Sequence, residues 1–275
     1  MEVTRVNIQL SKKWPIKLAK SQIFTVFLAG VAILSFLMTV WLGGMLMSAP
    51  DGLTARGYRE LKAGNGVRLH AVRASPEKIS LKAIETNVTD DPEDGMNGGF
   101  FWEGQLLSIA VINDRPVKGA PGDYGSGWYN IDRPRGTLVW DGATGELSVQ
   151  VTDRAEELAV TDRSRYWAQG GVSMGLHNER FWQEQALLEE FPVMDEKRLR
   201  SAIVYDTDRR LWLLLSDGPC TGPEFRAAIK ETVAPGKLDD GIFLDGDGSS
   251  QLKLGQFKLP GDRRTVYQMI TLPGG

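Results

Sequence analysis

Alternation of apolar and polar residues is the dominant pattern along most of the chain. Residues 66–74 (GVRLHAVRA) and 79–86 (ISLKAIET) alternate with a period of two, which predicts half-buried strands. The same alternation continues through residues 104–113 and 137–151, and short Gly-containing turns separate these segments. The chain therefore reads as a succession of hairpins.

Fewer segments have a helical pattern. Residues 180–190 (RFWQEQALLEE) have helical composition, and residues 221–233 begin with Thr-Gly-Pro-Glu, which is typical of a helix N-terminus. Residues 201–218 predict two strands joined by a turn, in which Asp206 and Asp208 fit a solvated hairpin tip better than a metal site. Helices embedded among hairpins predict an α+β fold with a large, mostly antiparallel sheet and a few packed helices.

One stretch near the N-terminus has a different character. Residues 23–47 are apolar and contain no charged residue, which is long enough to cross a bilayer as a helix. A cleaved signal peptide has a shorter apolar core, so we expect a retained anchor in contact with lipid. Five basic residues precede the stretch, which predicts a single-pass protein with a cytoplasmic N-terminus and a periplasmic or extracellular domain.

These patterns divide the chain into four parts. We expect a basic cytoplasmic segment (1–22), a transmembrane helix (23–47), a linker (48–58) and one globular domain (59–275). The overall net charge of -3 hides an asymmetry, because residues 1–50 carry a balance of +4 and the remainder therefore -7. An acidic domain without a basic stripe disfavours nucleic-acid binding.

Cysteine and histidine limit the cofactor chemistry. The single cysteine, Cys220, excludes an intramolecular disulfide and a zinc site of the CxxC type. The two histidines, His70 and His177, lie far apart in the sequence, and a zinc site built on them would need further ligands. We expect no metal or organic cofactor.

The segment GIFLDGDGSSQLKL (241–254) is the strongest candidate for a site. An apolar strand runs into two aspartates, two glycines and two serines, which is more than a tight turn requires. An EF-hand is excluded, because with Asp245 at position 1 the required Gly and Glu positions hold Ser250 and Gln256. A looser cation site remains open.

Three further stretches combine glycine with polar side chains, and a fourth places an arginine and a serine at the start of a strand. Glycine lets backbone amides approach a ligand, although a hairpin turn also explains an Asn-Gly-Gly sequence. The stretches are Asn97-Gly98-Gly99-Phe100, Gln169-Gly170-Gly171, Arg200-Ser201 and Ser216-Asp217-Gly218.

The order of these motifs along the chain resembles the phosphodiester glycosidase family. The order is NGGFF, QGG, an Arg-Ser-Ala-Ile-Val strand, a Ser-Asp-Gly strand end, a helix and LDGDGSSQL. Bacterial relatives in that family are connected with exopolysaccharide. The resemblance covers roughly residues 60–272. The family's last motif usually reads LDGGGSS, and Asp247 here replaces its middle glycine.

The resemblance implies hydrolysis of a sugar C1–O–phosphate bond in a phosphorylated glycan. A carboxylate beside C1 stabilises an oxocarbenium-like transition state, and Asp245 is the first choice for it. Arg200 would hold the phosphate and Asp217 would be a second carboxylate. The expected substrate-binding residues are Asn97, Gly98, Gly99, Phe100, Gly170, Gly171, Gly246, Asp247, Gly248, Ser249 and Ser250.

Two other functions fit the same residues. A membrane-tethered, non-catalytic module would bind phosphorylated glycan during exopolysaccharide assembly or export. A metal-dependent phosphodiesterase would break the P–O bond instead, and would release a sugar 1-phosphate.

Overall fold

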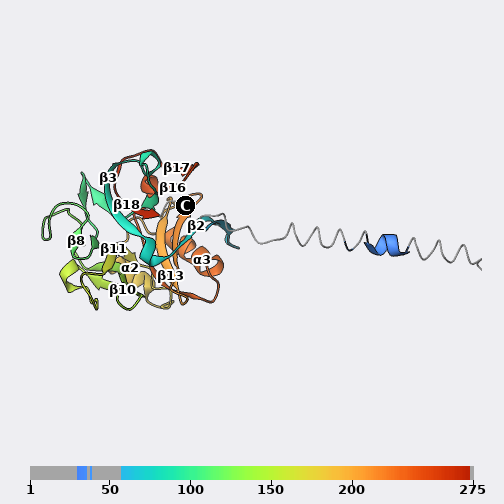
Figure 1. Cartoon of the computed structure of the whole chain (residues 1–275), viewed down its shortest axis with the longest axis horizontal. Coiled ribbons are helices and arrows are strands. Elements are labelled where there is room, and N and C mark those ends of the chain that lie inside the picture. Colours follow the sequence, from blue (N-terminus) through green and yellow to red (C-terminus); the bar gives the residue numbers. More distant parts are fainter. Residues whose placement is uncertain (1–29, 36–37, 39–56, 273–275) are drawn as a thin grey trace, which may run out of the picture. The chain divides into compact units, whose positions relative to one another are not determined.

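The computed structural model describes residues 30–35, 38 and 57–272 (Figure 1). The chain divides into two units, residues 1–52 and 53–275, and residues 30–35 of the first unit are helical. Among the described residues, no helix is long and apolar enough to cross a membrane. Most of the predicted transmembrane helix (23–47), the basic segment before it and nearly all of the predicted linker lie outside the described residues.

The described residues of the second unit form three sheets and a two-stranded hairpin (Figure 1). Every pair of neighbouring strands in them is antiparallel. The six-stranded sheet has the order β1 (Tyr58–Lys62), β2 (Arg68–Ala74), β14 (Leu211–Ser216), β13 (Ser201–Asp206), β15 (Leu238–Phe243), β12 (Val172–Ser173). A five-stranded sheet has the order β10 (Glu146–Thr152), β9 (Arg135–Asp141), β11 (Tyr166–Gly170), β7 (Ala110–Ile112), β8 (Arg115–Pro116). Another has the order β17 (Phe257–Leu259), β16 (Leu252–Leu254), β4 (Asp94–Asn97), β18 (Val266–Leu272), β3 (Ser80–Thr86). The hairpin pairs β5 (Phe101–Trp102) with β6 (Gln105–Leu106).

The two α-helices of this unit lie where the sequence predicts them. Helix α2 (Trp182–Leu188) is shorter than expected, and α3 (Gly222–Thr232) begins with a capping box between Thr221 and Glu224. Both helices pack in one apolar cluster with alternate residues of the six-stranded sheet. Four short 3₁₀ turns complete the elements: Pro76–Lys78, Val88–Asp90, Ala155–Glu157 and Asp247–Ser249, called η4 below.

The sheet-rich α+β fold is confirmed, but its strands form three sheets rather than one large sheet. Residues of the six-stranded sheet that point away from the helices pack in a second cluster with residues of both five-stranded sheets. A central sheet is therefore covered by helices on one face and by strands on the other, and both faces are buried.

The predicted hairpin at 201–218 forms β13 and β14, but its turn differs from the expectation. Asp206 is buried and accepts hydrogen bonds from the amide of Asp208, the amide and Nε of Arg210, and Nε1 of Trp212. The prediction of a solvated tip was wrong for this residue, because its carboxylate organises the turn from inside.

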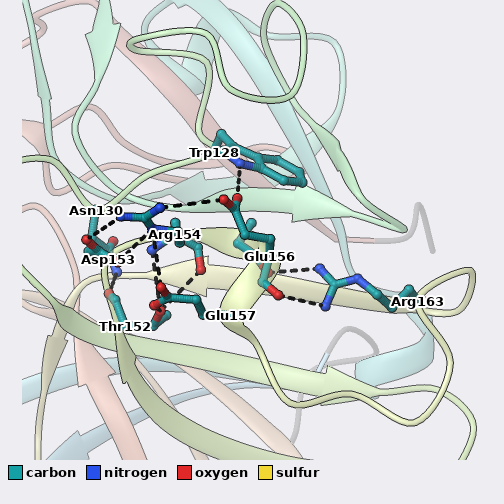
Figure 2. A network of polar contacts seen from close by, with 9 residues as sticks. Trp128, Asn130, Thr152, Asp153, Arg154, Glu156, Glu157 and Arg163 are labelled. Carbon is teal, nitrogen blue, oxygen red and sulfur yellow. Dashed lines mark hydrogen bonds and ion pairs between the residues drawn. The ribbon is translucent and has the colours of Figure 1, made fainter.

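A polar network at one end of the β9–β10 pair gives a test of local stability (Figure 2). Asn130 is buried, donates to the Thr152 carbonyl at 2.7 Å and to Thr137 Oγ1 at 2.9 Å, and accepts from the Ile109 amide at 3.0 Å. Around it, Arg154 bridges Asp153 and Glu157 at the surface.

We expect Asn130→Ala to lower the free energy of unfolding by about 2 kcal/mol, because three buried partners lose their hydrogen bonds. This corresponds to a fall in Tm of about 5 °C for a domain of this size. Glu157→Gln, in the exposed part of the same network, should change stability by less than about 1 kcal/mol. Urea unfolding of both variants checks this, and equal losses would contradict it.

Candidate active site at the end of strand β15

Asp245 lies where the six-stranded sheet meets strand β4 of another sheet. The chain leaves β15 at Leu244, whose amide donates to the Ser201 carbonyl at 2.9 Å. The next amide, that of Asp245, donates to the Gly98 carbonyl at 3.2 Å. The half-buried Asp245 side chain is therefore fixed by main-chain bonds to two sheets.

Asn97 holds this junction together. Its side chain is buried, and Nδ2 donates to the Asp245 carbonyl at 2.8 Å. Its Oδ1 accepts from the Gln251 amide at 3.0 Å and from the Ser201 hydroxyl at 3.2 Å. The Ser201 hydroxyl also lies 2.9 Å from that of the buried Ser250. Asn97 and Ser250 are thus occupied within the protein, and their role in this geometry is to position the Asp245 loop.

The amides of Gly98 and Gly99 are also occupied. They donate to the main-chain carbonyl of Gln268 at 3.0 Å and to its Oε1 at 2.9 Å. A Cβ on Gly98 would lie 1.4 Å from Gln268 Oε1, and a Cβ on Gly99 would lie 2.6 Å from Ser108 Cβ. These glycines let β4 approach its neighbours, and their amides do not face a ligand.

The second glycine pair has a similar explanation. The Gly170 amide donates to the Ile109 carbonyl, and the Gly171 amide donates to the Gly136 carbonyl. A Cβ on Gly170 would lie 2.3 Å from Asn130 Oδ1, and one on Gly171 would lie 2.2 Å from the Phe243 carbonyl oxygen. Close packing between sheets requires glycine here, whether or not a ligand binds nearby.

The environment of the Asp245 carboxyl suits acid–base chemistry. Burial raises its pKa to about 7, while the Ser249 hydroxyl and the Arg264 guanidinium beside it act in the opposite direction. Ser249 is 1% exposed, so its hydroxyl is shielded from water beside this carboxyl. A carboxyl group with a pKa near neutrality can donate or accept a proton at physiological pH.

The loop after Asp245 is enclosed by charged side chains. Asp247 is exposed, and its Oδ2 lies 3.5 Å from Nη1 of Arg198. On the other side, the Asp262 amide donates to the Gly248 carbonyl at 3.2 Å, and Asp262 forms an ion pair with Arg264. A Cβ on Gly248 would meet the Asp262 carboxylate, and one on Gly246 would lie 2.8 Å from the Leu199 carbonyl oxygen.

The conformation of Asp247 explains why glycine fits the motif at this position. Its φ is +53°, in the left-handed region that side chains other than Asn, Asp and Gly seldom adopt. An aspartate is tolerated here at a modest energetic cost, and it adds a negative charge to the loop.

Arg200 does not reach the site in this structure. It is buried, and its Nε donates to the Cys220 carbonyl while its Nη2 donates to the carbonyls of Val193 and Glu196 at 2.7 Å. Its guanidinium also lies 5.2 Å from the centre of the Phe191 ring. The donors of Arg200 are used here to fix residues 192–196, so holding a phosphate, as the sequence predicts, would require Arg200 to give up these bonds.

Asp217 lies at the same end of the six-stranded sheet as Asp245, with β13 between them. Two strand spacings separate such positions by about 10 Å. Its carboxylate lies 3.1 Å from Nε2 of His70 and forms an ion pair with Arg68. It lines a separate pocket of about 310 Å³ together with Arg68, Lys197 and Glu224. The structure therefore brings Asp217 to the same edge as Asp245 but not into direct contact with it.

The comparisons with known proteins bear on the fold. No family model and no curated protein matches the chain. The solved catalytic domain of zebrafish N-acetylglucosamine-1-phosphodiester alpha-N-acetylglucosaminidase, auto-inhibited by its pro-peptide, superimposes with a TM-score of 0.54. It is 14% identical over 78% of this chain and 81% of that domain. The fold is similar to that of a phosphodiester glycosidase.

Two other solved structures match more weakly. A hypothetical protein from Synechocystis is 15% identical over 78% of this chain and 61% of its own, with a TM-score of 0.42. A putative exported protein from Burkholderia pseudomallei is 15% identical over 78% of this chain and 57% of its own, with a TM-score of 0.35. The likeness to the glycosidase domain, at this low identity, is one of fold.

Against that glycosidase-like fold, two arginines stand out that the sequence did not single out. Arg198 and Arg264 come from different loops and flank η4, with 40% and 43% of their side chains exposed. Arg198 lies two residues before Arg200. Side chains two positions apart in an extended segment share a face, and this spacing was the only sequence signal for Arg198.

Phe100, which was expected to bind substrate, is half-buried against the helical cluster, and the Arg135 guanidinium lies 5.8 Å from its ring centre.

Metal ligands are not assembled in the described part of the chain. Within residues 30–35, 38 and 57–272, no group of three His, Cys, Asp or Glu side chains is arranged to hold an ion. The looser cation site that the aspartates of LDGDGSS left open has no such support among these residues.

Proposed function

We propose that the protein is a hydrolase that cleaves the C1–O bond of a sugar-1-phosphodiester in an envelope or extracellular glycan. The observation that carries the proposal is the Asp245 carboxyl: it is half-buried at a strand end, has a pKa near neutrality, and lies beside the Ser249 hydroxyl and the Arg264 guanidinium, while Arg198 pairs with Asp247 in the next turn. The similarity of the fold to a glycosidase domain acting on such a diester supports the same class of reaction.

The reaction needs a proton donor and a stabilised leaving phosphate, and these residues supply both. As the C1–O bond breaks, its electron pair leaves with the phosphate, and positive charge develops at the sugar ring. Protonated Asp245 gives its proton to the departing oxygen, and Arg198 and Arg264 stabilise the phosphate. Water adds to C1 and passes a proton to the Asp245 carboxylate, which restores the acid and leaves free sugar and a phosphomonoester.

The Ser249 hydroxyl has a defined part in this scheme. It is buried beside the Asp245 carboxyl, and its interaction with that group lowers the pKa that burial raises. A hydroxyl in this place stabilises the charged form of the carboxylate and orients it for proton transfer.

The test is product analysis with the purified full-length chain and a panel of chromogenic sugar-1-phosphodiesters, in water enriched in heavy oxygen. C–O cleavage puts the heavy oxygen into the free sugar, which is the expected result. Heavy oxygen in the phosphate would establish P–O cleavage and overturn the proposal.

A non-catalytic glycan-binding module is the second candidate, and the extra carboxylate at Asp247 is the feature that favours it. Binding of the diesters without turnover across the panel would decide for the module. Turnover that depends on Asp245 would decide for the hydrolase.

A further inference from the structure

Charged side chains surround η4 in an arrangement that the reaction scheme does not require. Arg198 lies between two acids, with Nη2 at 2.7 Å from the Glu196 carboxylate and Nη1 at 3.5 Å from that of Asp247. Arg264 on the other side forms an ion pair with Asp262, whose own amide bonds to Gly248. Both arginines are therefore already partly neutralised.

Counting these groups gives the net charge around the loop. Two guanidinium groups face three paired carboxylates, those of Glu196, Asp247 and Asp262, so these five groups sum to one negative charge. The Asp245 carboxyl beside them adds further negative charge whenever it is ionised. Without the carboxylate of Asp247 the five groups would balance, so this residue supplies their excess negative charge.

The placement of Asp247 makes this difference relevant to a bound anion. It is two residues from Asp245 and two residues from Ser249, in one continuous turn. Its side chain is about half exposed, so its charge is in contact with solvent next to these groups.

We propose that Asp247 makes this site select singly charged phosphodiesters over doubly charged phosphomonoesters. The inference rests on the proposed function and names the charge class of its ligand. A monoester carries about twice the charge of a diester near neutral pH, because its second pKa is about 6. Repulsion from one carboxylate therefore acts about twice as strongly on the monoester, and the phosphomonoester formed by hydrolysis is released rather than retained.

The experiment compares two small probes in direct binding measurements on the full-length chain. Phenyl phosphate is the doubly charged monoester, and methyl phenyl phosphate is the singly charged diester with the same ring. At about pH 7 and about 20 mM salt, where charges are weakly screened, the wild type should bind the diester more tightly. Asp247→Asn removes the charge and keeps a residue that tolerates positive φ.

At an exposed site, removing a nearby unit charge changes affinity by roughly three-fold for each charge on the ligand. We therefore expect Asp247→Asn to tighten the diester roughly three-fold and the monoester roughly ten-fold, so that the preference shrinks. The matched control is Asp239→Asn, an exposed carboxylate at the other end of β15, which should leave both constants unchanged.

Three outcomes would overturn the inference. Asp247→Asn could increase the affinity for both probes equally, it could leave both affinities unchanged, or neither probe could bind to the wild type. The selectivity is read from binding, so its outcome separates from that of the proposed function. If the protein prefers the diester but never hydrolyses one, the hydrolase proposal is wrong and the selectivity is supported. If it hydrolyses diesters but shows no preference that depends on Asp247, the hydrolase proposal is supported and the selectivity is wrong.

Discussion

Replacing Asp245 by Asn should abolish hydrolysis of sugar phosphodiesters and, at the same time, stabilise the folded protein at alkaline pH. Loss of a proton-transferring carboxyl lowers turnover by about a thousand-fold. The substitution keeps the shape of the side chain, and the main-chain bonds of residue 245 to Gly98 and Asn97 remain. The loss is therefore one of chemistry rather than of loop position.

The gain in stability follows from proton linkage. The folded-state pKa of Asp245 is raised to about 7 by burial, while an unfolded aspartate has a pKa of about 3.9. The folded state thus binds more protons between these values, so the wild type loses stability as pH rises from about 4 through 7. Because the side chain is only half-buried, we expect Asp245→Asn to be about 2 kcal/mol more stable at about pH 8, and equal to the wild type at about pH 4.

Turnover assays and urea unfolding across this pH range, on the same preparations, measure both effects. Asp239→Asn is the control, since it removes an exposed carboxylate from the same strand and should change neither quantity appreciably. An Asp245→Asn protein that keeps wild-type turnover would remove Asp245 from the mechanism. A variant equally destabilised at every pH would show that the carboxyl is a structural group.

Replacing Arg200 by Met should lower the free energy of unfolding by about 4 kcal/mol, because the carbonyls of residues 192–196 and Cys220 lose a buried partner. Arg200→Lys should recover part of this, since one ammonium group satisfies fewer of these carbonyls than a guanidinium. Chemical unfolding of the two variants measures the order. If Arg200→Lys has wild-type stability but no longer binds the phosphodiester probe, Arg200 contacts substrate as the motif suggested.

The elements of this fold were predictable to a large extent, and their assembly was not. Period-two alternation located the strands at 66–74, 79–86 and 201–218, and the Thr-Gly-Pro-Glu start located α3. Alternation fixes which side chains share a face, but it does not specify which strand lies beside which. The division into three sheets therefore could not be read from the pattern.

The candidate site shows the same limit at the level of single residues. A glycine pair indicates that another group approaches the backbone closely, but it does not indicate whether that group belongs to a ligand or to the protein. At Gly98-Gly99 and Gly170-Gly171 the neighbours are buried protein groups. Asn97 and Arg200 were expected to face a ligand. In the structure Asn97 bonds to the main chain of the Asp245 loop, and Arg200 bonds to the main chain of the nearby residues 193–196. Asp245 was the residue for which local sequence was most informative, because a carboxylate that ends an apolar strand is forced to the sheet's edge.

The Asn97–Asp245 hydrogen bond joins residues 148 positions apart and belonging to different sheets. Contacts of such long range form late, since closing a long loop is entropically costly before other contacts compensate. A folding intermediate with only one sheet in place would hold Asp245 on an unanchored turn. Under the proposed function, gain of activity during refolding would therefore report the docking of the two sheets, the last stage of folding rather than the first.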